Sequence, residues 1–307
     1  MNTAVMSSAT SRKASLLLPA LLACYLVWGS TYLAIRLALV SFPPFFQMGT
    51  RFLVAGALLM GWVLWRRSRT AGTPQPLPTP RQWRNALVIG TLMLGGGMGL
   101  TASAEQHIGS GLIAAFIAVV PMLVCGWGLL FGQRPSRLEL AGMAVGMVGV
   151  VLLVRGASFS AAPIGIVSIA AATMAWSLGS VLTTKLPLAP GAAGFSSEML
   201  CGGAVLMVIS LALGEQPHWP PTPLAAAAWL YLVVFGSLIA FSAYLYLLAH
   251  ASPAMATSYA FVNPLIALLL GVAVASESVT GGEWIACGVV LAGVFLIFRG
   301  KTQSSPK

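Results

Sequence analysis

Three ionisable side chains lie inside long apolar stretches of the sequence, where they could bind a solute or exchange a proton. Arg51 is about two helical turns into one stretch, Glu105 ends another, and Glu198 lies near the start of a third. A charge at such depth must face a cavity, water or a partner of opposite charge. We therefore expect Arg51 and Glu105 to form an ion pair that acts as a coupling or gating site, with Glu198 as a second candidate. The alternatives are a solvated loop for Glu105 and, for Glu198, a place in the first helical turn that complements the helix dipole.

Aromatic, hydroxyl and amide side chains form a second group, which could line a cavity for a planar or amphipathic solute. The tryptophans of this group are far from the ends of their stretches, so each indole N–H needs a partner. The alternatives are a core contact between two helices for the tryptophans, bonding to the preceding turn for the serine, and purely interhelical bonding for the amide. The predicted cavity residues are Trp28, Ser30, Tyr32, Trp176, Tyr244, Tyr259 and Asn263.

Two prolines inside apolar stretches, Pro121 and Pro264, should kink the helices that contain them. Each lacks a backbone donor and frees a carbonyl one turn earlier. Another stretch carries four glycines between positions 95 and 99. Each costs a helix about 1 kcal/mol relative to alanine, so we expect close helix packing there or a flexible segment beside the cavity.

The elements that must position these residues are membrane helices. Hydrophobic residues make up 58% of the 307 positions and charged residues 7%, with a mean hydropathy of +0.90, which no soluble core of this size needs. A membrane helix takes roughly 20 apolar residues. The sequence therefore predicts an all-α polytopic membrane protein with ten transmembrane helices, at about 16–37, 44–65, 84–104, 110–131, 136–154, 163–184, 195–213, 224–248, 252–274 and 279–298.

Basic residues favour one orientation of these helices. Only Arg36 and Arg155 would lie at outer ends if the N-terminus is inside. Both termini, as tails over 1–15 and 300–307, are therefore predicted to be cytoplasmic. The residues placed on the cytoplasmic side are Arg12, Lys13, Arg66, Arg67, Arg69, Arg81, Arg84, Arg134, Arg137, Lys185, Arg299, Lys301 and Lys307.

The two halves of the chain repeat each other. Trp28 matches Trp176, Pro121 matches Pro264, and the Gly-Thr-Leu at 90–92 matches the Gly-Ser-Leu at 236–238, all at nearly one offset. Because each half holds five helices, an odd number, the second half enters the membrane from the opposite side. Inverted repeats over 16–155 and 163–299 could exchange conformations around a site near the midplane, which is alternating access.

Two helix starts carry the spacing of a capping box, Ser136 with Glu139 and Thr280 with Glu283. In this motif the hydroxyl and the carboxylate satisfy the free backbone N–H groups of the first turn. We therefore expect a structural role for both glutamates.

Several motifs carry a family resemblance over nearly the whole chain. They are Trp28-Gly29-Ser30-Thr31-Tyr32, the Ala104-Glu105 step, Glu198-Met199-Leu200, and Tyr259-Ala260-Phe261-Val262-Asn263-Pro264. This set resembles EamA-type transporters of the drug/metabolite transporter superfamily, and within them YedA-type exporters. The resemblance implies a multi-pass protein of the bacterial inner membrane, a central cavity lined chiefly by helices 1, 3, 4, 6, 8 and 9, and export of amino acids, nucleobases or aromatic compounds.

A secondary transporter of a small-molecule substrate is thus the expected function, with protons as a candidate coupling ion. The chain has no G-x-x-x-x-G-K-[ST] motif and so no nucleotide motor of its own. A facilitative uniporter or a channel for small polar solutes is the alternative, since Asn263-Pro264 is similar to the aquaporin motif. That alternative is weakened because the first half has Val120-Pro121 in the equivalent place.

Other classes of protein are not expected. The chain has no Asp, no H-E-x-x-H and no G-x-S-x-G, which argues against an enzyme. A net charge of +10 does not indicate nucleic acid, because the basic residues lie at helix ends. We expect no cofactor and no metal, and the four cysteines, Cys24, Cys125, Cys201 and Cys287, lie in apolar runs as packing residues.

Overall fold

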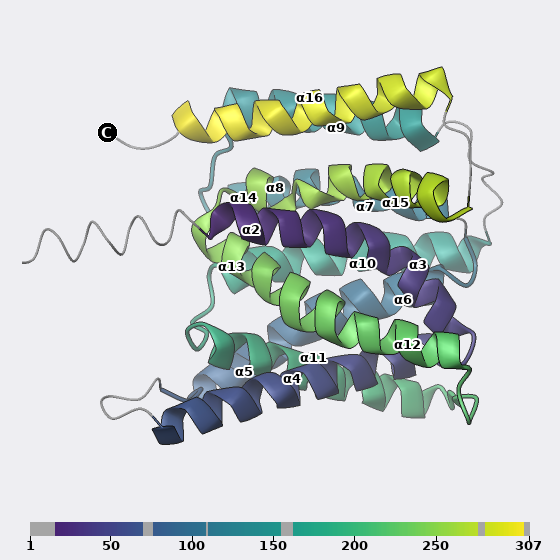
Figure 1. Ribbon diagram of the computed structural model, residues 1–307. Helices are drawn as coiled ribbons and strands as arrows, with labels where there is room; N and C mark the ends of the chain where they lie inside the picture. Colours follow the sequence, from purple (N-terminus) through teal and green to yellow (C-terminus); the bar gives the residue numbers. More distant parts are fainter. Residues whose placement is uncertain (1–15, 70–75, 109, 155–161, 276–279, 304–307) are drawn as a thin grey trace, which may run out of the picture.

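The chain folds into a bundle of helices that run roughly along one axis (Figure 1). The computed structural model describes residues 16–69, 76–108, 110–154, 162–275 and 280–303, and within these ranges it contains no β-strand. The start of the first helix and the ends of α4 (Pro44–Arg69) and α16 (Gly281–Gln303) lie at the same end of the bundle. Arg155, named above for orientation, lies outside the described residues, as do 1–15 and 304–307 of the two predicted tails.

The helices follow the predicted order, with several apolar stretches divided into shorter pieces. The first half consists of α2 (Leu17–Leu22), η1 (Ala23–Val27), α3 (Trp28–Leu39), α4, α5 (Pro80–Gly90), η2 (Thr91–Gly99), α6 (Leu100–Ala104), α7 (Ser110–Ile117), α8 (Val120–Leu130) and α9 (Arg137–Val154). The second half consists of α10 (Pro163–Thr183), α11 (Ala192–Ala212), α12 (Pro223–Tyr231), η3 (Leu232–Phe241), α13 (Ser242–His250), α14 (Pro253–Thr257), α15 (Tyr259–Ala275) and α16.

Eight of the described helices are long and apolar enough to cross a bilayer, when helical pieces that continue one another are joined. A shorter apolar helix covers Ala115–Leu130, and α9 packs along α16. These helices confirm a polytopic all-α membrane protein, whereas the count of ten transmembrane helices stays a prediction. The last helix continues to Gln303, beyond the predicted boundary at 299. At Gly300 a Cβ atom would lie 2.7 Å from the Ser136 hydroxyl, so close packing against the start of α9 continues there.

Three helices contain π-helical segments, and two of these segments lie in matching places of the two halves. The segment η2 lies in the third helix of the first half, and η3 lies in the equivalent helix of the second. In a π-helix the backbone N–H groups bond five residues back, which displaces carbonyls from the regular α-helical ladder. Such segments occur often at functional sites. The two segments therefore indicate a functional region in the third helix of each half.

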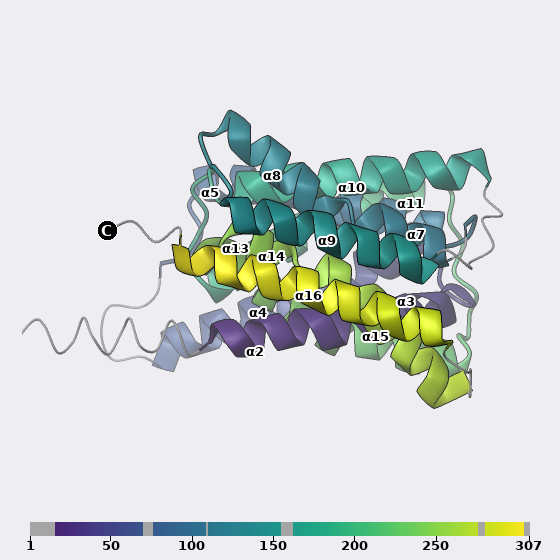
Figure 2. The same ribbon diagram turned by 90° about the horizontal axis from the view of Figure 1, so that it is seen from above.

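Pairs of equivalent helices form the two outer sides of the bundle. Helices α9 and α16 pack side by side on one face, and α4 packs along α11 on the opposite face (Figures 1 and 2). Glycines allow the backbones to approach: a Cβ at Gly142 would lie 2.6 Å from the Gly293 carbonyl oxygen, and one at Gly203 would lie 2.9 Å from the Leu53 nitrogen. Small residues at such crossings are the usual means of close packing in membranes. The cavity helices α3, α10 and α15 lie between these two sides (Figure 1).

Carboxylates hold the starts of three helices. Glu139 accepts from the Ser136 backbone N–H at 2.8 Å, and Glu283 accepts from the Thr280 N–H at 2.7 Å, which confirms both capping boxes. Glu215 makes a cap that the sequence does not reveal, because it lies in the loop after α11 and is distant in sequence from the helix it caps. Its two oxygens accept from the backbone N–H groups of Phe45 and Phe46 at 3.2 and 2.7 Å, in the first turn of α4.

Candidate functional site

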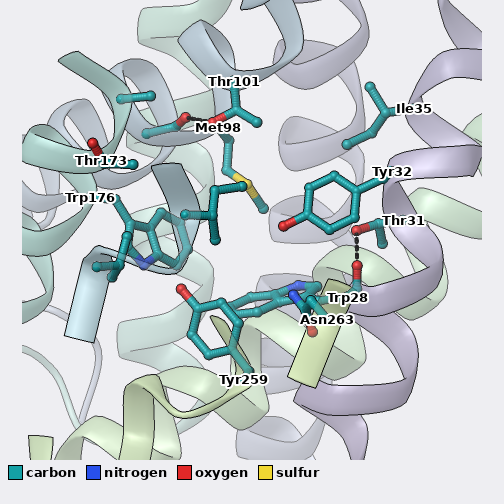
Figure 3. Close-up of a pocket in the computed structure, with 14 residues that line it drawn as sticks. Trp28, Thr31, Tyr32, Ile35, Met98, Thr101, Thr173, Trp176, Tyr259 and Asn263 are labelled. Carbon is teal, nitrogen blue, oxygen red and sulfur yellow. Dashed lines mark hydrogen bonds between the residues drawn. The ribbon is translucent and has the colours of Figure 1, made fainter. Parts of the chain in front are cut away.

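A cavity lies between helices from both halves of the chain (Figure 3). About 540 Å³ of space, including part of its open mouth, lies between the side chains. The first half contributes α3, η2, α6, α7 and α8, and the second half contributes α10 and α15. The lining residues are Trp28, Thr31, Tyr32, Ile35, Gly97, Met98, Thr101, Ile117, Val120, Ala172, Thr173, Trp176, Tyr259 and Asn263.

The spacing of the lining residues on α3 follows from helical geometry. Trp28, Thr31, Tyr32 and Ile35 stand at positions i, i+3, i+4 and i+7, which form one face of an α-helix. Ser30 falls outside this face. Its hydroxyl lies 2.7 Å from the Val27 carbonyl and 2.6 Å from the Tyr231 hydroxyl on α12, so the structure does not place it in the cavity.

Three aromatic rings line one wall of the site, and a fourth packs against them. Trp28 lies edge-on to Trp176 at 5.5 Å between ring centroids and to Tyr259 at 4.7 Å, and Tyr244 stacks on Trp176 at 5.2 Å. These distances are those of favourable aromatic pairs, each worth roughly 0.5–1.5 kcal/mol beyond area burial. Trp28 and Trp176 therefore both contact each other and line the cavity, so the two alternatives predicted for them are not exclusive.

Tyr244 supports this wall from behind. It is fully buried and absent from the lining, and its hydroxyl pairs with the Ser180 hydroxyl at 2.8 Å. The sequence predicted Tyr244 at the cavity, and the structure instead places its ring against the lining rings of Trp28, Trp176 and Tyr259. Helix 8 of the predicted set thus contributes a supporting layer to the site, through η3 and α13.

The two tryptophans differ in how their indole N–H groups are satisfied. The Trp28 Nε1–H donates to the Gly236 carbonyl in η3 at 3.3 Å. Trp176 lies against Gly97 of η2, where an added Cβ would be 2.8 Å from its ring. Its buried Nε1 has no hydrogen-bond partner among the described residues, although the hydroxyls of Tyr244 and Tyr259 are near.

Asn263 is the other lining residue with unsatisfied polar atoms. It is 1% exposed, and neither its Nδ2 nor its Oδ1 has a hydrogen-bond partner within the described part of the chain. The Tyr32 side chain points into the same space and lies near the amide (Figure 3). An unpaired amide in a buried site normally costs about 1–3 kcal/mol, so this group is available to a solute that enters the cavity.

Three threonines that line the cavity were not selected from the sequence. Thr31, Thr101 and Thr173 each donate to a carbonyl of their own helix, at 2.8, 2.7 and 2.9 Å. Their oxygens keep lone pairs that can accept from a ligand. Spacing could have found two of the three: Thr31 is three residues after Trp28, and Thr173 is three residues before Trp176.

Arg51 and Glu105 do not form the predicted ion pair in this structure. The fully buried guanidinium donates from Nε to the Ser237 hydroxyl at 2.9 Å and lies over the Phe52 ring. Its Nη2 and both carboxylate oxygens of Glu105 have no hydrogen-bond partner among the residues described. The two groups nevertheless lie close enough for an electrostatic interaction, as do Glu105 and Arg36. Their coupling or gating role stays a prediction.

Glu198 lies deeper in its helix than the sequence indicates. Helix α11 begins at Ala192, after Gly191 adopts a positive φ of 58°, so Glu198 is in the second turn. The alternative of a first-turn residue that complements the helix dipole is therefore wrong. The side chain is 1% exposed with Oε2 unpaired among the described residues, and α5 approaches at Gly90, where a Cβ would lie 2.8 Å from the Glu198 carbonyl.

The two prolines occupy different local structures. The α-helical hydrogen-bond pattern is interrupted by a turn at 118–119, directly before α8 begins, and Pro121 is in the first turn of α8. Pro264 lies inside the continuous helix α15, and the break in that region falls at Ser258. Ser258 keeps helical dihedrals, and its backbone bonds to residues three away instead of four: its N–H donates to the Met255 carbonyl, and its own carbonyl accepts from the Phe261 N–H. The helix is thus interrupted about one turn before Pro121, whereas Pro264 lies within a continuous helix, and the kink at each proline stays a prediction.

Comparison with known proteins relates this fold to one family. The model of the EamA-like transporter family matches twice, over residues 15–155 and 163–299. The "Uncharacterized inner membrane transporter YedA" of Escherichia coli (strain K12) is 40% identical over 283 residues, which cover 92% of this chain and 90% of that protein. "Protein PecM" of Dickeya dadantii is 28% identical over 276 residues, covering 89% and 86%. A solved crystal structure with 22% sequence identity matches with a TM-score of 0.76 over 95% of this chain and 99% of the other, which shows a shared fold. This chain therefore belongs to the EamA-like transporter family of the drug/metabolite transporter superfamily, and it is a multi-pass protein of the inner membrane.

Proposed function

We propose that the chain is a secondary transporter that exports small metabolites or drug-like compounds by alternating access. Amino acids, nucleobases and aromatic amphiphiles are the candidate substrates. The observation that carries this proposal is the cavity that both halves of the chain line, with Trp28 and Tyr32 from one repeat and Trp176, Tyr259 and Asn263 from the other. A site that two related halves share can open to either side when the halves exchange conformations.

The distribution of basic residues supports cytoplasmic termini. Arg69 ends α4, Arg81 and Arg84 lie at the start of α5, and Lys185 follows α10. These helix ends gather at the end of the bundle where α2 begins and α16 ends (Figure 1). Lys and Arg concentrate in cytoplasmic loops of membrane proteins. Single cysteines at Lys185 and at Trp219, on either side of α11, test this orientation. An impermeant maleimide should label only Trp219→Cys from outside, and labelling of both from one side would contradict the crossing of the membrane by α11.

Proton coupling through Glu105 is the second part of the proposal. The carboxylate is buried without a hydrogen-bond partner in the described structure, near Arg36, Arg51 and the Tyr32 hydroxyl. Such a group can take up and release a proton as its surroundings change between two states. We expect Glu105→Gln to abolish the dependence of transport on a pH gradient, whereas Glu283→Gln, at an exposed capping box, should keep it. Full rate with an unchanged pH profile in Glu105→Gln would remove this coupling role.

Counterflow in proteoliposomes tests the carrier mechanism itself. Vesicles loaded with an unlabelled compound and diluted into its labelled form accumulate label only if the protein binds on one side and releases on the other. The panel is L-phenylalanine, uracil and ethidium, one compound from each candidate class. A carrier gives saturable, transient accumulation for at least one of them. Unsaturable flux without counterflow would instead favour a channel for small solutes.

A further inference from the structure

We infer that the cavity binds an uncharged, planar heterocycle that presents an N–H beside a carbonyl, a lactam edge, to the amide of Asn263. This inference rests on the proposed function in one respect, since it takes the cavity as the substrate site. It narrows the substrate to one chemical class. Among the three candidate classes, it selects compounds of nucleobase type over zwitterionic amino acids and organic cations.

The amide of Asn263 determines which polar groups a ligand needs. Its Nδ2 donates, its Oδ1 accepts, and both are buried and unpaired among the described residues. The complement of one donor beside one acceptor is one acceptor beside one donor on a planar edge. A lactam has this arrangement, and asparagine binds nucleobase edges through two hydrogen bonds in the same way. A ligand with only an acceptor would leave the Oδ1 atom unpaired.

The lining favours an uncharged ligand. None of the fourteen residues drawn around the cavity is Asp, Glu, Lys, Arg or His. Glu105 is one turn beyond Thr101 and does not line the cavity, and Arg51 is engaged with Ser237. A zwitterion would lose the hydration of two charges here without a partner for either, which is costly.

The aromatic wall favours a planar ligand over an organic cation. Cations bind to ring faces, but Tyr244 covers one face of Trp176 at an interplanar angle of 24°. The rings of Trp28 and Tyr259 meet at 74°, so they already use part of their faces and edges on each other. A flat heterocycle can pack against the remaining apolar surface of Trp28, Ile117 and Met98 while its edge reaches Asn263.

Two further donors are placed for a second carbonyl on the ligand. Trp176 Nε1 is buried without a hydrogen-bond partner among the described residues, and the Tyr32 hydroxyl points into the cavity (Figure 3). Trp28 is excluded from this role because its N–H donates to Gly236. A ligand such as uracil, with two carbonyls and two N–H groups on one planar ring, satisfies the whole set.

Isothermal titration of the purified full-length protein in lipid nanodiscs tests the inference. The two ligands are uracil and 1,3-dimethyluracil, which keeps the ring and both carbonyls but has no N–H. The variants are Asn263→Leu and Asn263→Ala, so that one remains if the other fails to fold, as judged by thermal melting. The control is Asn85→Leu, which removes a buried amide that donates to the Pro187 carbonyl, away from the cavity.

We expect the wild type and Asn85→Leu to bind uracil at least about tenfold more tightly than 1,3-dimethyluracil, the discrimination that one bidentate amide pair typically gives. In both Asn263 variants the difference should disappear because uracil binding weakens. Equal binding of the two ligands by the wild type, no detectable uracil binding, or tighter binding of L-phenylalanine or ethidium would overturn the inference. Counterflow of those other compounds with no uracil binding would leave the carrier proposal standing and remove only the ligand class. If uracil binds in a way that depends on Asn263 but no panel compound shows counterflow, the ligand class stands and the carrier proposal is removed.

Discussion

Replacing Gly97 with alanine tests the contact that positions Trp176 at the cavity. A Cβ at this position would lie 2.8 Å from Cε3 and 3.1 Å from Cβ of Trp176, whereas ordinary contact begins at 3.4 Å. The indole must therefore retreat by about 0.6 Å. Its room to move is restricted, because Tyr244 stacks on the indole and is itself held by Ser180.

Overpacking of this kind costs about 1–3 kcal/mol, and the better helix propensity of alanine offsets up to about 1 kcal/mol of it. The matched control is Gly126→Ala in α8, where an added Cβ meets nothing within 4 Å, so only the propensity gain remains. We expect the thermal midpoint of Gly97→Ala in nanodiscs to fall a few degrees below that of Gly126→Ala, with slower counterflow. Equal midpoints and equal transport would refute the idea that Gly97 sets the position of Trp176.

Two further substitutions test buried polar contacts by thermal melting. Glu215→Ala should destabilise the protein by about 1–2 kcal/mol because α4 loses the acceptor for two backbone N–H groups. The stability of Glu215→Gln should lie between that of Glu215→Ala and that of the wild type. A wild-type thermal midpoint for both variants would show that water replaces the cap. Ser237→Ala should lower the free energy of unfolding by about 1–3 kcal/mol, because the buried Arg51 Nε loses its acceptor. Ser237→Thr should keep the hydroxyl acceptor and so the stability. Equal thermal midpoints for the two variants would contradict that account.

Most of the fold follows from hydropathy, because a spanning helix must satisfy its backbone internally over a fixed thickness. The family match over 15–155 and 163–299 agrees with the sequence repeat, and both capping boxes were predictable from local spacing. Breaks in helices were less predictable. Pro264 stays within α15, and the chain instead breaks at Ser258, where no proline occurs. Such breaks depend on tertiary contacts and on neighbours that restore backbone bonds, which composition does not encode.

The candidate site was predictable where a residue type has few alternative roles deep in the membrane. Trp28, Trp176 and Asn263 are conspicuous at membrane depth and do lie at the cavity. Ordinary residues such as Met98 and Thr101 carry no such signal, because their role depends on which helix face the cavity meets. Ser30 was predicted at the cavity and does not line it. It is one residue before Thr31 on the same helix, and its hydroxyl contacts Tyr231 of α12 instead.

Each tryptophan contacts a π-helical segment of the other repeat, but only Trp28 forms a hydrogen bond there within the described structure. Trp28 of the first repeat reaches Gly236 in the π-helical segment of the second, and Trp176 of the second repeat lies against Gly97 in the π-helical segment of the first. The indole N–H donates in the first case and is unpaired among the described residues in the second. Inverted repeats that exchange conformations should exchange this difference, so the state that faces the opposite side should bond Trp176 and release Trp28.

Trp28→Phe and Trp176→Phe should therefore shift the equilibrium between the two states in opposite directions. One buried hydrogen bond contributes about 1 kcal/mol, which corresponds to about a fivefold change in population. The readout is the rate at which an impermeant maleimide, added from outside, labels a single cysteine at Thr101, after the native cysteines are replaced. We expect one variant to label faster and the other more slowly than the parent protein, with Trp284→Phe, on the exposed surface, unchanged. Shifts in the same direction would mean that the tryptophans only pack the core, and that their N–H groups do not distinguish the two states.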